Sequence, residues 1–337
     1  MLSTKPHQWR RSGHSHIASV LILTVSILLA LLLLVNRQYV VDQIAVWRYQ
    51  PSSSIAQLAK QSGMNDTAKF YFYASQPAIE DAKPFNSDCG RKETSTAILG
   101  CYNGMNIYIY NVTNTKLDGI KETTAAHEML HAAYVRLSDS EKHNVDVLLE
   151  AEYQKLKGNK DFAERMAFYA KTEPGERDNE LHSVVGTEVA SISPELEIYY
   201  KRYFSDRSKV IAMHDKYASV FADLQIESDT LSKQLTDLGA TITQQTKDYN
   251  ASVSTLNADI STFNQQASSG GFASKQEFNS QRAVLVAKAS QLDQIRLTIS
   301  SEITQYNDLH DQLTSVASES TALNQSIDSS LAPAPSL

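Results

Sequence analysis

The chain has 337 residues, a formal net charge of -7 and two cysteines. Its lysines and arginines are scattered and form no basic stripe, so the composition argues against nucleic acid as a partner. The length exceeds the roughly 100 to 200 residues of a usual single domain, and we therefore expect more than one structural unit.

An uncharged apolar block runs from Ile17 to Val35. At about 1.5 Å per residue, a helix of this length covers most of the ~30 Å hydrocarbon core of a bilayer. Positive charge without acidic residues before the block predicts a cytoplasmic tail over 1–16 and places the rest of the chain outside the cytoplasm. A cleaved signal peptide is the alternative, but no small-x-small triplet follows the block. The sequence therefore predicts a single-pass protein of the cell membrane.

A juxtamembrane segment is expected over 36–65, followed by a domain over 66–204. The aromatic run at 69–75 has the composition of a strand, and residues 98–110 predict a β-hairpin that turns at an Asn-Gly pair. Apolar periodicity over 122–204 predicts helices alone. Strands followed by helices indicate the α+β class.

The two cysteines, Cys89 and Cys101, are close in sequence and on the same side of the predicted membrane helix. In an oxidising compartment such a pair predicts one local disulfide. Two unpaired buried thiols are the alternative interpretation.

The C-terminal region, 205–330, repeats apolar residues every seven positions, which is typical of a coiled coil. The first seam contains Leu235, Ile242, Tyr249, Leu256 and Phe263 with Val253 and Ile260, and the return seam contains Phe278, Leu285, Leu292, Ile299, Tyr306 and Leu313. A Ser-Gly interruption near 268–272 predicts an antiparallel helical hairpin. This hairpin could serve self-association or partner docking, and residues 331–337 are predicted to be disordered.

The strongest chemical signal is the pentapeptide His127-Glu128-Met129-Leu130-His131. A four-residue step on a helix puts both imidazoles on one face, where they can bind the same metal ion. Glu128 then lies beside the open coordination position and can act as a general base. Small uncharged neighbours, including Ala132 and Ala133, argue against a solvated structural helix.

The segment TTAAHEMLHAAY resembles the active-site helix of zincin metallopeptidases, and the strand NIYIY at 106–110 resembles their substrate-binding edge strand. The resemblance implies one Zn2+ per chain, bound by His127 and His131, and a peptide or protein substrate paired along 106–110. It also implies that Glu128 deprotonates a zinc-activated water. The Gly and His that metzincins carry after the motif are missing, which favours the gluzincin type with a later glutamate as the third ligand.

Glu180 resembles the glutamate of the gluzincin Asn-Glu element, on a helix that Asp178 could cap. Glu188, two turns further along, is the alternative third ligand or a partner that orients a histidine ring. Glu150 and Glu152 are less favoured donors, because exposed helix carboxylates are common.

The sequence thus predicts a membrane-anchored zinc endopeptidase. His182 is the candidate transition-state stabiliser, with Tyr199 and Tyr200 as further donors for the oxyanion. The alternative function is an extracytoplasmic coiled-coil tether or docking protein with a structural or vestigial zinc site. A structural site is closed by four protein ligands, whereas a catalytic site leaves one position for solvent.

Overall fold

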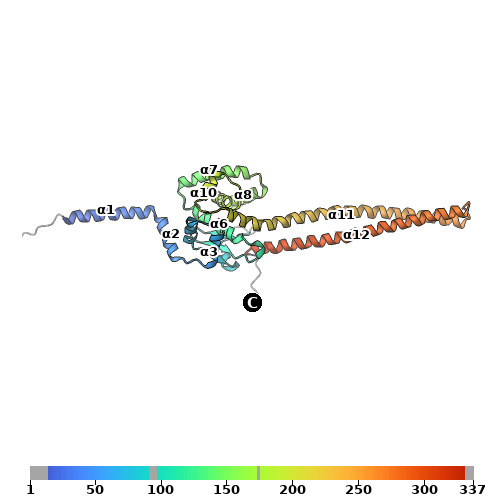
Figure 1. Ribbon diagram of the computed structural model, residues 1–337, viewed down its shortest axis with the longest axis horizontal. Coiled ribbons are helices and arrows are strands. Elements are labelled where there is room, and N and C mark those ends of the chain that lie inside the picture. Colours follow the sequence, from blue (N-terminus) through green and yellow to red (C-terminus); the bar gives the residue numbers. More distant parts are fainter. Residues whose placement is uncertain (1–13, 91–96, 173–174, 331–337) are drawn as a thin grey trace, which may run out of the picture. The chain divides into compact units, whose positions relative to one another are not determined.

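A computed structural model describes residues 14–90, 97–172 and 175–330 (Figure 1). The described chain is mostly helical and contains one small three-stranded sheet. It divides into two compact units, residues 1–217 with 327–337, and residues 218–326. The expected tail over 331–337 and nearly all of the expected tail over 1–16 lie outside the described residues.

Three helices come first in the chain: α1 (His14–Val35), α2 (Arg37–Arg48) and α3 (Ser53–Gln61). The apolar side chains of α1 are exposed, from Val20 to Val35. Within the described residues, no helix taken singly has the length and apolar character of a bilayer span. The segments Ser19–Val35 and Arg37–Arg48 satisfy those two criteria only as a pair, with a bend of 75° between them.

The segment expected to be juxtamembrane contributes to the core of the first unit. Ile55, Leu58 and Ala59 of α3 are buried in it, together with Met64. The packed unit therefore includes residues well before position 66, the domain boundary expected from the sequence.

The prediction of a strand over 69–75 is wrong, because helix α4 spans Asp66–Ala74. The Asn65 side chain caps this helix by accepting a hydrogen bond from the Ala68 amide at 3.1 Å. Ala68 and Phe72, four residues apart, are fully buried, which is helical spacing. Aromatic β propensity reflects fit to a half-buried surface, and here the cap and the core packing outweigh it.

The sheet contains β1 (Ala78–Glu80), β2 (Gly100–Tyr102) and β3 (Ile107–Tyr110) in the order β1-β3-β2. The predicted hairpin is confirmed: β2 and β3 are antiparallel, and Gly104 in the turn has a positive φ of 90°. The prediction that the strand at 106–110 is an edge strand is wrong. β1 pairs with its other side in parallel, so β3 is the central strand and β2 lies at an edge.

A disulfide joins Cys89 to Cys101, as predicted from their spacing. Helix α5 (Ala82–Asp88) ends immediately before the first cysteine, and the second is the middle residue of β2. The bond therefore ties the chain after α5 to the edge strand of the sheet.

The helices that follow the sheet agree with the sequence prediction. They are α6 (Ile120–Tyr134), α7 (Asp139–Leu156), α8 (Lys160–Thr172), α9 (Arg177–Glu188) and α10 (Pro194–Tyr200), after a 3-10 turn at Thr115–Leu117. Helix α6 is the centre of this unit, with contacts to α3, α4, α9, β2 and β3. Four alanines and two larger residues of α6 have no exposed surface: Ala125, Ala126, Met129, Leu130, Ala132 and Ala133. Small side chains let several elements approach one helix at once.

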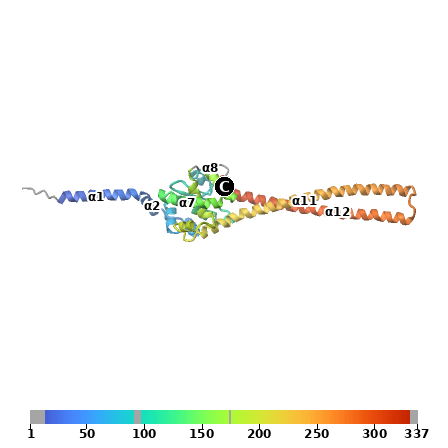
Figure 2. The same cartoon turned by 90° about the horizontal axis from the view of Figure 1, so that it is seen from above.

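The predicted helical hairpin is formed by α11 (Ser208–Ser268) and α12 (Lys275–Ile327), which run side by side in both views (Figures 1 and 2). Leu235, Leu256 and Ile299, which were predicted in the seams, are buried, and so are Leu231, Val316 and Leu323. The rings of Phe263 and Phe278 pack 5.0 Å apart next to the turn. Ile260, predicted in the seam, is exposed, and Lys288 bonds the neighbouring Asp259 at 2.7 Å instead.

A buried ion pair joins α2 to the end of α6. The Arg136 guanidinium donates to both carboxylate oxygens of Asp42, each at 2.8 Å, and the two side chains are 7% and 4% exposed. This paired geometry satisfies both charges in a site that water hardly reaches.

We expect Asp42→Ala to lower the free energy of unfolding by about 3 kcal/mol, because it leaves a buried guanidinium without its counter-charge. Chemical denaturation followed by circular dichroism measures the change. Asp66→Ala is the matched control, since Asp66 pairs with Lys69 on the open surface and its removal should leave the transition unchanged. Equal midpoints for Asp42→Ala and wild type would contradict a stabilising role for the buried pair.

Candidate metal centre

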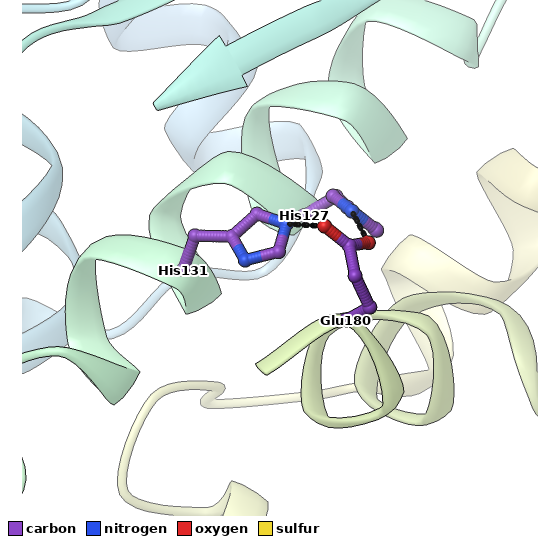
Figure 3. A group of neighbouring side chains, drawn as sticks. All are labelled: His127, His131 and Glu180. Carbon is purple, nitrogen blue, oxygen red and sulfur yellow. Dashed lines mark ion pairs between the residues drawn. The ribbon is translucent and has the colours of Figure 1, made fainter. Parts of the chain in front are cut away.

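The two histidines of α6 and one glutamate of α9 meet between these helices (Figure 3). His127 Nε2 lies 3.6 Å from one carboxylate oxygen of Glu180, and His131 Nε2 lies 3.4 Å from the other. All three donor atoms are within 4.8 Å of one another. The structure thus brings together His127, His131 and Glu180, the ligand set expected from the sequence.

The two nitrogen–oxygen distances, which end on different oxygens of Glu180, are close to the distance between neighbouring ligands of a tetrahedral zinc ion. With Zn–N and Zn–O bonds of about 2.0 to 2.1 Å, the edges of a regular tetrahedron measure about 3.3 Å. The side chains of His127, His131 and Glu180 are 15%, 10% and 7% exposed, so the donors are largely shielded from water. Among the described residues, this group holds three donors and no fourth His, Cys, Asp or Glu.

A hydrogen-bonded relay fixes the orientation of His131. Its Nδ1 lies 3.0 Å from the Asn179 side-chain oxygen, and the Asn179 amide nitrogen donates to Glu176 at 3.0 Å. Because an amide oxygen can only accept, Nδ1 is the donor in this hydrogen bond. Nε2, which points toward Glu180, is then the ring nitrogen that can bind a metal ion.

The short distance between α6 and α9 depends on a glycine. A Cβ on Gly186 would overlap a methyl group of Leu130 on α6 and lie 2.8 Å from the ring of Tyr200. Helix α9 begins at Arg177 with Glu176 as its N-cap residue, so Asp178 does not cap it as expected. Glu180 consequently lies in the first turn, on the side that faces α6.

Glu128 also lies next to a glycine. Its side chain packs against β2, where a Cβ on Gly100 would be 2.8 Å from Glu128 Oε1 and 2.5 Å from a methyl carbon of Thr124. The edge strand therefore runs close to α6 because this position has no side chain. Glu128 is 5% exposed.

A cleft of about 540 Å³ runs over these residues. Its lining includes the edge strand β2, both cysteines of the disulfide, and His127, Glu128 and His131 of α6. Tyr169 and Tyr217 line it as well, and burial raises the pKa of Tyr217 to about 12. The cleft exposes the three metal donors and Glu128 to one shared space.

The alternative carboxylate donors have other partners. Glu188 is on the wall of the cleft but pairs with Arg165 and with His214 Nε2 at 3.5 Å. Glu150 accepts a hydrogen bond from Arg177 at 2.8 Å. Glu152 is buried, where it accepts from Lys155 and from the Ser193 amide. None of the three belongs to the donor group.

His182 lies in the aromatic core and not in the cleft. It is fully buried, its Nε2 is 2.9 Å from the Tyr199 hydroxyl, and Tyr200 donates to its carbonyl oxygen. Burial, with a smaller contribution from His131 and His127, lowers the pKa of His182 to about 3 and keeps the imidazole neutral. The expected roles of these residues as oxyanion donors are not supported, because none of them lines the cleft.

The sequence did not reveal the residues that orient His131 and make room for Glu128. Asn179 was identified only as the neighbour of Glu180, and Gly100 only as part of a hairpin. Comparison of the chain with protein-family models, with curated proteins and with solved structures found no match. The interpretation of the site therefore depends on its own geometry.

We expect Asn179→Ala to weaken zinc binding by about 10- to 100-fold, because His131 loses the partner that sets its tautomer and ring orientation. Competition with a chelator of known affinity measures the change. Asn144→Ala, an exposed position on α7, is the control and should bind zinc as wild type does. Unchanged affinity in Asn179→Ala would show that the relay does not tune the site.

Proposed function

We propose that this chain is a membrane-anchored, zinc-dependent endopeptidase. The observation that carries the proposal is the meeting of His127, His131 and Glu180 in a cleft that also holds Glu128. Three protein ligands leave a fourth position for a reactant, which is the arrangement of catalytic zinc sites.

A bound zinc ion would supply a Lewis acid that polarises the scissile carbonyl and lowers the pKa of water toward about 7. Glu128 accepts the proton of the attacking water and passes it to the leaving amine, as its place beside the donor group allows. Its low exposure keeps competing water away from the carboxylate. His127, His131 and Glu180 would act as the ligands of the zinc ion. The hydrogen bond to Asn179 holds the His131 ring in its orientation.

The edge strand β2 is the binding place for a peptide backbone. The Tyr110 amide donates to the Leu99 carbonyl at 2.8 Å, so residues 99 and 101 direct their backbone groups toward β3. Successive residues of an antiparallel strand direct their backbone N–H and C=O groups to opposite sides. Gly100 and Tyr102 therefore direct these groups away from β3. An extended substrate can pair there by β-augmentation, in the place of the pairing expected along 106–110.

The anchor in this proposal is α1, which carries no charge from Ile17 to Val35 and whose apolar side chains from Val20 to Val35 are exposed. The basic residues before it favour a cytoplasmic N-terminus and a catalytic unit outside the cytoplasm. The disulfide between Cys89 and Cys101 is what an oxidising compartment allows.

The hairpin of α11 and α12 supports the second candidate, a docking or tethering protein. Its length suits self-association or partner binding outside the cytoplasm. In that case the metal site would be structural or vestigial. A donor group of three among the described residues favours the catalytic interpretation, because structural sites use four.

Glu128→Gln should keep about one zinc per chain and lose hydrolysis of casein, because the amide preserves the shape but cannot accept a proton. Elemental analysis and a fluorescent casein assay measure the two properties. His131→Ala is the comparison variant and should lose both. Casein cleavage at the wild-type rate by Glu128→Gln would refute the proposed mechanism.

Gly100→Ala should lower kcat/KM by at least about tenfold while the chain still binds zinc, because the new methyl group displaces Glu128 or the edge strand. Gly90→Ala is the matched control: Gly90 also lines the cleft, and a Cβ there meets nothing within 4 Å. Equal kcat/KM in the two variants would show that the approach of β2 to α6 is not needed for catalysis.

A further inference from the structure

Helix α2 has its amphipathic faces reversed. Val41, Ile44 and Trp47 recur at three-residue steps on one face and are 59%, 40% and 77% exposed. The opposite face carries Asp42, which is 3% exposed and paired with Arg136. A helix on the surface of a soluble unit would place its acid outside and its apolar residues inside.

The exposed face of α2 also has the chemistry of a membrane interface. Arg37 and Arg48, at its two ends, lie close to the same side of the helix as Ile44 and are exposed. An indole with arginines at the margins of an apolar stripe matches the boundary between headgroups and acyl chains. One residue, Asn36, separates α2 from the apolar helix α1, and the described parts of the two helices are bent by 75°.

We propose that the Val41–Ile44–Trp47 face of α2 lies in the surface of the bilayer that holds α1. A bend of 75° is near the right angle between a helix that crosses a bilayer and one that lies in its plane. The reversed polarity follows from this arrangement, since lipid covers the apolar face and protein covers Asp42. This inference rests on the membrane anchoring in the proposed function.

The arrangement fixes one end of the cleft at the membrane. Arg136, held by Asp42 of α2, also donates to the Tyr102 hydroxyl at 3.3 Å and to the Ala132 carbonyl at 2.6 Å. Tyr102 is the last residue of the edge strand, and Val135 beside Arg136 lines the cleft. The substrates favoured by this geometry are therefore membrane-proximal segments of proteins inserted in the same bilayer.

Fluorescence quenching by brominated lipids tests the position of α2. The chain has two tryptophans, so Trp9→Phe leaves Trp47 as the single reporter in the full-length protein. We reconstitute this variant in phosphatidylcholine and phosphatidylglycerol vesicles with bromine near the headgroup or near the bilayer centre. Shallow bromines should quench Trp47 about twofold more than deep ones, in keeping with a burial depth of about 5 to 10 Å.

The matched control moves the reporter to another exposed apolar position. In Trp9→Phe/Trp47→Phe/Val147→Trp, the new indole replaces a residue of α7 that is 57% exposed. It should be quenched by aqueous iodide and not by either brominated lipid. Iodide quenching of Trp47 with no effect of bromine would overturn the inference. Equal bromine quenching of the indoles at positions 47 and 147 would overturn it as well.

Cleavage assays test the inferred substrate class. The casein sequence that the protein cuts fastest is offered as a soluble peptide and in two membrane-bound substrates in the same vesicles. In these two it lies either next to a transmembrane helix (the near site) or beyond a long Gly-Ser spacer (the far site). Wild type should prefer the near site by about tenfold, through a higher effective concentration at the cleft. Val41→Ser/Ile44→Ser/Trp47→Ser should lose this preference and still cut the soluble peptide at the wild-type rate.

The outcomes separate the two proposals. Equal cleavage of near and far sites by wild type would overturn the substrate class while leaving the peptidase intact. A protein that cuts none of the three substrates would refute the peptidase, and Trp47 quenching would then still decide where α2 lies.

Discussion

The site depends on how closely two helices can approach. Donors on α6 and α9 reach one ion only if the helix axes are near, and Gly186 against Leu130 makes that possible. Buried alanines on the other sides of α6 allow the remaining elements to pack as tightly. Dense packing leaves the ligand helix little freedom, so the donors are held in position by the same contacts that stabilise the unit.

The features that could be predicted from sequence are those encoded over a few residues. The HEMLH spacing, the heptads and the Asn-Gly turn each specify a geometry within one or two turns of chain, and the structure contains all three elements. Features set by distant parts of the chain were missed. The aromatic run in α4 becomes helical because of its cap and its place in the core, and β3 becomes central because β1, which gave no sequence signal, pairs beside it.

His182 illustrates a limit of reasoning from sequence proximity. It is two residues after Glu180, and a step of two residues turns about 200° around an α-helix, so the two side chains point to opposite faces. Glu180 faces the metal donors, and His182 faces the tyrosines of the core. Asn179, the residue before Glu180, does take part in the site. Its side chain bonds His131, a role that becomes visible only when the position of His131 on α6 is known.

Helix α6 and the residues just after it connect the candidate metal centre to α2. The residues that follow the second metal donor lead within a turn and a half to Arg136, which joins Asp42 of α2 and Tyr102 of the edge strand. A buried, doubly bonded ion pair tolerates little displacement of either partner, because each charge would lose its counter-charge in a poorly hydrated place. The orientation of α2 is therefore coupled to that of the edge strand that lines the cleft. Under the proposed function, a bilayer that holds α2 would also decide which polypeptide segments can reach Glu128.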